Sequence, residues 1–291
     1  MGPGVISGGQ LGEALAAARQ RLIAAGIKPD EAAVDVDVYA RTILGWDRAT
    51  LLASLREPAP AELEPRFSEW LERRERREPT AYIVGRREFW GREFLVTPAV
   101  LVPRPETEFI VEEGLALMIG VTAPRIADIG TGSGILAVTL AAELPASTVV
   151  ATDVSAPALE VAHQNAERIG VASRMTVVNT SYLNDVAGPF DLIVANPPYV
   201  REVDRPGLSR DTRHEPEVAL FGGPDGLRDL GGVLDAAVAK LKTGGWLVME
   251  FGYGQDEDVQ RLVAARAVLR LDHIHNDLQD IPRTAVVQRN L

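Results

Sequence analysis

Apolar residues recur every three or four positions over the first quarter of the chain, a spacing that predicts amphipathic helices. The expected helical segments are 10–26, 29–45, 47–55 and 60–78. Gly26 and Gly45 end the first two segments, as C-terminal cap glycines commonly do. We therefore expect a small helical domain over residues 1–78.

The pattern changes between residues 79 and 104. Short strand-like stretches flank Gly91 and Arg92 there and predict a β-hairpin within a linker. Pro105 suits the first position of a helix, so the next helix is expected to begin there. The second domain is predicted to cover residues 105–291.

From residue 125 onward, strand-like runs alternate with helical ones. The predicted strands are 125–130, 148–153, 174–179, 190–196, 245–252, 268–275 and 284–289. Their nearly continuous apolar character is typical of a parallel sheet covered by helices on both faces. A loop joins the last two strands, so that edge should be antiparallel. The predicted fold class is α/β, with a doubly wound, mostly parallel seven-stranded sheet.

Composition narrows the chemistry and the partners. The chain has 291 residues, no cysteine and a net charge of -11. Disulfides, thiolate zinc sites and cysteine nucleophiles are excluded, and the four histidines lack metal-ligand spacing, so no metal is expected. The densest basic segment, 71–78, alternates Arg with Glu and is interpreted as a solvated helix face. A nucleic-acid partner is therefore disfavoured. Without a signal peptide or an apolar run of membrane-spanning length, the protein is expected to be cytoplasmic.

A glycine-rich turn follows the first predicted strand of the second domain. Asp128 precedes Gly130, Thr131, Gly132 and Gly134 in a G-x-G-x-G pattern. A dinucleotide fold requires G-x-G-x-x-G instead, and the observed spacing resembles motif I of S-adenosylmethionine (SAM) methyltransferases. That resemblance implies that this loop holds the cofactor.

Two later strand ends extend the expected cofactor site. Asp153 ends the second strand, where a carboxylate can bind both ribose hydroxyls of either cofactor type. After the third strand, SAM methyltransferases often place an acidic or amide group against the adenine amine. Ser181 stands there instead, followed by Tyr182, which is expected either to neighbour adenine or to pack in the core. Asn179 and Asn184 are alternative polar contacts.

The fourth strand ends in Asn196, Pro197, Pro198 and Tyr199. A planar nitrogen attacks a methyl group poorly because its lone pair is delocalised. The Asn196 carbonyl and a backbone carbonyl beside a rigid proline could accept its two N–H groups and aim it at the methyl. Tyr199 could form a wall for the planar group. The alternative is that the prolines only end the strand and Asn196 caps a turn.

This tetrapeptide resembles the [ND]-P-P-[YFW] signature of amino-methyltransferases, whose targets are adenine bases or glutamine amides. The segments 79–91, 101–108, 213–216, 221–227 and 277–283 resemble the release-factor glutamine methyltransferases, the PrmC/HemK family. The resemblance covers nearly the whole chain.

That family implies methyl transfer to the side-chain nitrogen (N5) of the glutamine in the Gly-Gly-Gln (GGQ) loop of peptide release factors. It implies that Asn196 and Pro197 accept the amide hydrogens, and that Arg104 lines the pocket with Pro198 and Tyr199. It also implies that Phe89 lines the pocket, and the alternative for Phe89 is a place in the core. Asn196 would also contact the cofactor. The helical domain would dock the release factor, and a monomer is expected.

Three other functions remain possible from the sequence. An adenine-N6 methyltransferase for DNA or RNA would need a basic groove, which the chain does not show. A ribosomal-protein glutamine methyltransferase would share the chemistry but differ from the chain at segments 87–90 and 104–108. A cofactor-binding module without catalysis would not need Asn196.

Overall fold

The computed structural model describes residues 9–290, so positions 1–8 of the predicted helical domain, and residue 291, lie outside the description. The chain divides into two compact units. Unit 1 contains Met1–Gly85 and Arg210–His214, and unit 2 contains Arg86–Ser209 and Glu215–Leu291. The domain boundaries at 78 and 104 stay predictions.

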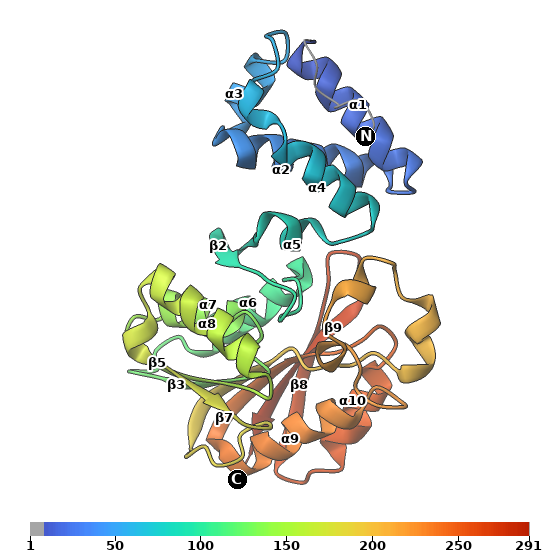
Figure 1. Ribbon diagram of the computed structural model, residues 1–291. Helices are drawn as coiled ribbons and strands as arrows, with labels where there is room; N and C mark the ends of the chain where they lie inside the picture. Colours follow the sequence, from blue (N-terminus) through green and yellow to red (C-terminus); the bar gives the residue numbers. More distant parts are fainter. Residues whose placement is uncertain (1–8, 291) are drawn as a thin grey trace. The chain divides into compact units, whose positions relative to one another are not determined.

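Unit 1 is helical, as predicted (Figure 1). Its α-helices are α1 (Leu11–Ala24), α2 (Pro29–Leu44), α3 (Arg48–Ala53), α4 (Arg66–Glu75) and α5 (Thr80–Val84). The segment predicted as one helix over 60–78 is instead a 3-10 turn, Ala61–Leu63, followed by α4. Pro65 separates the two because proline lacks the N–H that a continuous helix needs. Tyr39 and Trp70 pack edge to face in the core, with ring centroids 5.5 Å apart.

The arginine-rich end of α4 is not simply the solvated face that its charge pattern suggested. Arg74 is only 4% exposed. Its guanidinium lies 2.7 Å from a carboxylate oxygen of Asp35 and 2.7 Å from one of Asp211. Both aspartates are distant in sequence, so helical spacing alone could not reveal this buried ion pair.

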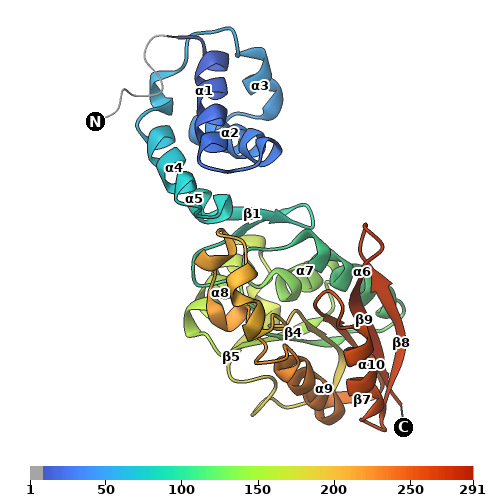
Figure 2. The same ribbon diagram turned by 90° about the vertical axis from the view of Figure 1, so that its right-hand side faces the viewer.

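Unit 2 contains the predicted seven-stranded sheet, in the order β5-β4-β3-β6-β7-β9-β8 (Figure 2). Its strands are β3 (Arg125–Ile129), β4 (Thr148–Asp153), β5 (Met175–Asn179), β6 (Phe190–Ala195), β7 (Leu241–Glu250), β8 (Leu269–Asn276) and β9 (Pro282–Arg289). The first five in the sheet order are parallel, and β9 is antiparallel to both of its neighbours. The expected antiparallel edge is confirmed.

Helices cover both faces of this sheet. They are α6 (Glu108–Leu117), α7 (Ile135–Glu143), α8 (Ala156–Ile169), α9 (Arg228–Lys240) and α10 (Asp256–Ala264). Side chains of α6, α7 and α8 join one apolar cluster with Ile126, whereas those of α9 and α10 join a second cluster with Ala127. Neighbouring residues of a strand point to opposite faces, which explains why the strands are apolar throughout. Within residues 9–290, no helix is long and apolar enough to cross a membrane.

The predicted hairpin is also present. Strands β1 (Arg86–Phe89) and β2 (Arg92–Leu95) pair antiparallel around Trp90 and Gly91, which both have positive φ. The helix expected from residue 105 begins as a 3-10 turn, Pro105–Thr107, and continues as α6.

Candidate functional site

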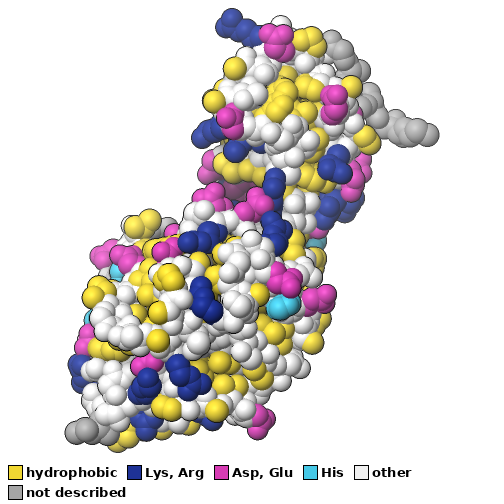
Figure 3. All heavy atoms as spheres, turned by 90° about the vertical axis from the view of Figure 1, so that its left-hand side faces the viewer, with side chains coloured by type: hydrophobic (Ala, Val, Ile, Leu, Met, Phe, Trp, Pro, Cys, Tyr) yellow, Lys and Arg dark blue, Asp and Glu magenta, His cyan; other side chains and the backbone are white. Residues whose placement is uncertain are grey.

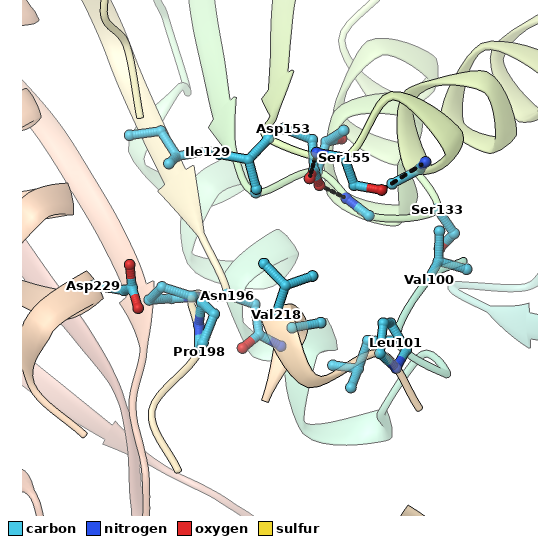
Figure 4. Close-up of a pocket in the computed structure, with 18 of the residues that line it drawn as sticks. Val100, Leu101, Ile129, Ser133, Asp153, Ser155, Asn196, Pro198, Val218 and Asp229 are labelled. Carbon is cyan, nitrogen blue, oxygen red and sulfur yellow. Dashed lines mark hydrogen bonds between the residues drawn. The ribbon is translucent and has the colours of Figure 1, made fainter. Parts of the chain in front are cut away.

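A cavity of about 300 Å³ lies in unit 2, lined by residues at the carboxyl ends of β3, β4 and β6 (Figure 4). Strand β3 is flanked by β4 on one side and β6 on the other, so the chain changes direction across the sheet at this point. Open parallel sheets bind ligands at such a switch point because the loops diverge there. The topology thus brings the glycine loop, Asp153 and Asn196 to one cavity.

The glycine loop leaves β3 in a conformation that requires glycine. Gly130, Gly132 and Gly134 have φ values of 72°, 55° and 83°. A Cβ atom at Gly134 would lie 3.1 Å from Ala162 of α8, so this glycine also permits close packing of two helices. Gly130 and Gly132 line the cavity, whereas Gly134 does not.

Asp153 holds the turn that follows β4. One carboxylate oxygen accepts the backbone N–H of Gly132 at 2.9 Å, and the other accepts that of Ser155 at 2.9 Å. Burial raises the pKa of Asp153, and these N–H donors oppose the shift. The carboxylate therefore links the glycine loop to the start of α8 and lines the cavity between them.

Asp128 lies beneath the glycine loop and is 1% exposed. Its Oδ2 accepts hydrogen bonds from Thr131 Oγ1 at 2.7 Å and from the Ala137 N–H at 3.1 Å. Its Oδ1 is buried and has no hydrogen-bond partner. Burial raises the pKa of Asp128 to about 7. Asp128 is not among the cavity-lining residues, so its two hydrogen bonds support the glycine loop from below.

A chain of hydrogen bonds fixes the side chain of Asn196. Its Nδ2 donates to Thr107 Oγ1 at 2.9 Å, and Thr107 Oγ1 donates to Glu250 Oε2 at 2.8 Å. Because the Thr107 proton is directed at the carboxylate, Thr107 can only accept from Asn196. The carboxamide is thereby oriented, and its Oδ1 is left as an acceptor.

Glu250 anchors this chain from the end of β7. It is 2% exposed and accepts a second hydrogen bond, from the Tyr199 hydroxyl at 3.0 Å. Burial raises the pKa of Glu250, and the charge of Glu250 raises that of Tyr199. Tyr199 thus belongs to the support of Asn196 and is not among the cavity-lining residues.

Arg104 and Glu215 connect two loops that line the cavity. Arg104 NH2 lies 2.5 Å from Glu215 Oε1, and the Val102 N–H donates to Glu215 Oε2 at 3.2 Å. The Glu215 side chain is 2% exposed. Figure 4 shows Leu101 and Val218, one from each loop, beside the cavity.

Comparison with known proteins decides the family. A family model described as the PrmC N-terminal domain matches residues 13–85, and one described as the methyltransferase small domain matches residues 111–208. The release factor glutamine methyltransferase of Bradyrhizobium diazoefficiens is 39% identical, over 96% of each chain. That of Cereibacter sphaeroides is 42% identical, over 89% of this chain and 91% of its own. The chain belongs to the release factor glutamine methyltransferase family.

Solved structures agree on the fold of this methyltransferase. The catalytic domain of hMettl16, in complex with a MAT2A 3′UTR hairpin, has a TM-score of 0.56 at 14% identity, covering 78% of this chain and 92% of its own. A methyltransferase from Pyrococcus furiosus has a TM-score of 0.50 at 18% identity, covering 70% and 91%. The predicted α/β methyltransferase fold is confirmed.

The cofactor of this methyltransferase is SAM. The cavity suits it because its lining contains a carboxylate for a ribose, at Asp153, next to the backbone of Gly130 and Gly132 in the glycine loop. When bound, SAM supplies a methyl group on a sulfonium. In residues 9–290, no group of three or more His, Asp or Glu side chains could hold a metal ion.

The structure gathers most of the predicted site residues at this cavity. The lining includes Arg104, Gly130, Thr131, Gly132, Asp153, Ser181, Tyr182, Asn196, Pro197 and Pro198. Phe89 does not line it. That side chain is 2% exposed and packs against Phe94 in the apolar core, with ring centroids 6.1 Å apart. Of the two alternatives expected for Phe89, the pocket-lining one is wrong and the core one holds, because the hairpin turns this residue into the core.

Sequence reasoning missed Thr107, Glu250 and Asp229. Thr107 lies within the recognised segment 101–108, and Glu250 is an acidic residue at the end of an apolar strand, which was a usable signal. Asp229 lies in the first turn of α9 and lines the cavity, but nothing in its local pattern indicated a ligand.

Proposed function

We propose that the protein transfers a methyl group from SAM to the side-chain amide nitrogen (N5) of the glutamine in the GGQ loop of peptide chain release factors. The observation that carries this proposal is the fixed carboxamide of Asn196, whose Oδ1 is directed to accept because its Nδ2 donates to Thr107. The names and near-complete coverage of the relatives support release factors as the substrate.

A glutamine amide nitrogen needs orientation more than activation by a base. In the proposed complex, Asn196 Oδ1 accepts one N–H and the Pro197 carbonyl accepts the other. These bonds restrict the rotation of the amide and turn the nitrogen toward the methyl group. Positioning of reacting groups has effective molarities of about 10⁵–10⁸ M, so a held amide accounts for much of the rate.

The surface chemistry favours a protein substrate over a nucleic acid. The net charge is -11, and on the face shown in Figure 3 basic side chains are interspersed with acidic ones. A nucleic-acid enzyme would gather Lys and Arg along one groove. We propose that unit 1 contacts the release factor, since its match to the PrmC N-terminal domain covers residues 13–85. We also propose a monomer acting in the cytoplasm.

The direct test is methyl transfer from labelled SAM to four substrates: a purified release factor, its variant with alanine in place of the GGQ glutamine, purified ribosomal proteins, and adenine-rich DNA. We expect label only on the unaltered release factor, and mass spectrometry should place it on that glutamine. Label on the DNA alone would show an adenine methyltransferase. Label on a ribosomal protein but not on the release factor would also overturn the proposal.

The variant Asn196→Ala tests the role of the carboxamide. We expect at least a 100-fold loss of kcat with the SAM affinity changed by less than about threefold, because the residue orients the acceptor amide. Asn276→Ala, at an exposed asparagine on β8, is the matched control and should keep full activity. Loss of SAM binding in Asn196→Ala would show that the assigned role is wrong.

A further inference from the structure

The adenine side of the cavity lacks the acidic residue expected after β5, where Ser181 stands. A second carboxylate nevertheless lines the same cavity. Asp229 comes from the first turn of α9, almost fifty residues later in the chain. Among the cavity-lining residues, Asp153 and Asp229 are the two acidic side chains. Both oxygens of Asp153 already accept backbone N–H groups at the glycine loop.

Asp229 is joined to the residue expected beside adenine. The Tyr182 hydroxyl donates to Asp229 Oδ1 at 2.9 Å. Burial, and after it this hydrogen bond, raises the pKa of Tyr182 to about 12. Arg228 NH2 donates to Oδ2 at 2.7 Å. Each carboxylate oxygen can accept more than one hydrogen bond, so both retain capacity for a ligand. The Asp229 side chain is 16% exposed, which is consistent with access from the cavity.

The tyrosine that accompanies Asp229 is held in place by its surroundings. Tyr182 has a positive φ of 52°, a backbone conformation that residues other than glycine rarely adopt. Its ring lies so close to Gly232 of α9 that a Cβ atom there would be 2.1 Å from the ring. Ser181, Tyr182 and Asp229 therefore form one wall that joins the β5 loop to α9. Val154, 55% exposed and next to Asp153, adds an apolar surface to the same cavity.

We propose that Asp229 accepts a hydrogen bond from the exocyclic amine of the SAM adenine, the contact that position 181 does not supply. The inference rests on the cofactor site described above. An adenine amine is a donor, and the carboxylate of Asp229 is an acceptor already aligned by Tyr182 and Arg228. A 6-oxo base would place a carbonyl oxygen against this carboxylate and would be rejected, so Asp229 determines the base specificity of the cofactor.

The test is a cycle of two ligands and two proteins, measured by isothermal titration calorimetry. The ligands are S-adenosylhomocysteine and its 6-oxo analogue, S-inosylhomocysteine. The wild type should prefer the adenine compound by at least about tenfold, as expected for a hydrogen bond to a charged acceptor. Asp229→Asn should reduce that preference to about threefold or less, because a carboxamide can face either base with its oxygen or its NH₂ group.

Asp235→Asn is the matched control, since Asp235 lies on the same helix with its side chain 72% exposed. It should retain the full preference. If Asp229→Asn fails to fold, Asp229→Ser takes its place with the same expected loss of preference. Tyr182→Phe keeps the ring and the carboxylate and should retain most of the preference for adenine.

The outcomes separate this inference from the cofactor site itself. If Asp229→Asn weakens both ligands equally, Asp229 only supports the wall and the proposed contact is wrong. A wild type that binds both ligands alike also overturns it. A wild type that binds neither ligand shows instead that the cofactor site is misassigned.

Discussion

Replacing Thr107 by valine tests whether the hydrogen-bond chain orients Asn196. Valine has nearly the same shape as threonine but has no hydroxyl. The change removes the acceptor of Asn196 Nδ2 at 2.9 Å and one of the two donors to Glu250. Thr107 is 1% exposed, so water cannot easily replace the lost partner.

The magnitude follows from the groups left unpaired. A buried donor without a partner costs about 1–3 kcal/mol, so the Asn196 carboxamide gains that much by turning toward another acceptor. Restoring the productive orientation then requires the same energy from the bound substrate. Because 1.4 kcal/mol corresponds to a factor of ten, kcat/KM should fall by about 5- to 150-fold. The SAM affinity should change much less.

The assay is steady-state methyl transfer to the release factor, with SAM affinity measured in parallel by calorimetry. Thr139→Val is the matched control, because Thr139 is 0% exposed and its hydroxyl has no hydrogen-bond partner. We expect that control to be as active as the wild type. If Thr107→Val also kept the wild-type kcat/KM, Thr107 would have no part in orienting Asn196.

Three further changes test other parts of unit 2. Glu215→Gln should raise the KM for the release factor and lower Tm by about 3–10 °C, since a charge-assisted hydrogen bond in a domain of this size is worth about 1.5–3 kcal/mol. Gly232→Ala should displace the Tyr182 ring and weaken S-adenosylhomocysteine binding in calorimetry. Asp128→Asn should flatten the pH dependence of the free energy of unfolding, followed by urea denaturation from pH 4 to pH 8. The folded-state pKa of Asp128, about 7, lies above its ordinary 3.8. Protonated Asp128 therefore favours the folded wild type at low pH, and that contribution is lost as the pH rises through 7.

Each of these three predictions has an outcome that would contradict it. Gly231→Ala is the control for Gly232, because the nearest atom to a Cβ at Gly231 is 3.7 Å away. Equal ligand affinities in the two glycine variants would refute the packing argument. A Glu215→Gln variant with unchanged KM and Tm would show that the ion pair with Arg104 holds neither loop. For Asp128, the difference in unfolding free energy between wild type and variant should change over pH 4 to 7, and a constant difference would contradict the pKa argument.

Local patterns were sufficient for the elements and for most of the cofactor loop. The apolar runs predicted the seven strands, and the loop between the last two predicted the antiparallel edge. The turn at Gly91 predicted the hairpin. Such features depend on residues that are close in sequence, so periodicity and turn chemistry reveal them.

Local patterns failed where partners come from distant segments. Phe89 belongs to a recognised stretch, yet the hairpin buries it in the core. Arg74 lies in a segment that resembles a solvated helix face, yet it pairs with Asp35 and Asp211. In both cases the environment depends on how separate elements pack, which no local spacing encodes.

By itself, the sequence determined the fold class, the family and the tetrapeptide that ends β6. Glycines, prolines and apolar periodicity reveal these features because they fix the backbone conformation of residues close to them in sequence. Only the tertiary structure decided which side chains support that tetrapeptide. Thr107, Asn196 and Glu250 are distant along the chain and come together because β6 and β7 are adjacent parallel strands, with the turn before α6 beside their ends. Likewise, only the packing of α9 against the β5 loop brings Asp229 to Tyr182. The orientation of the Asn196 carboxamide therefore depends on hydrogen bonds between residues that lie as far as 143 positions apart in the sequence.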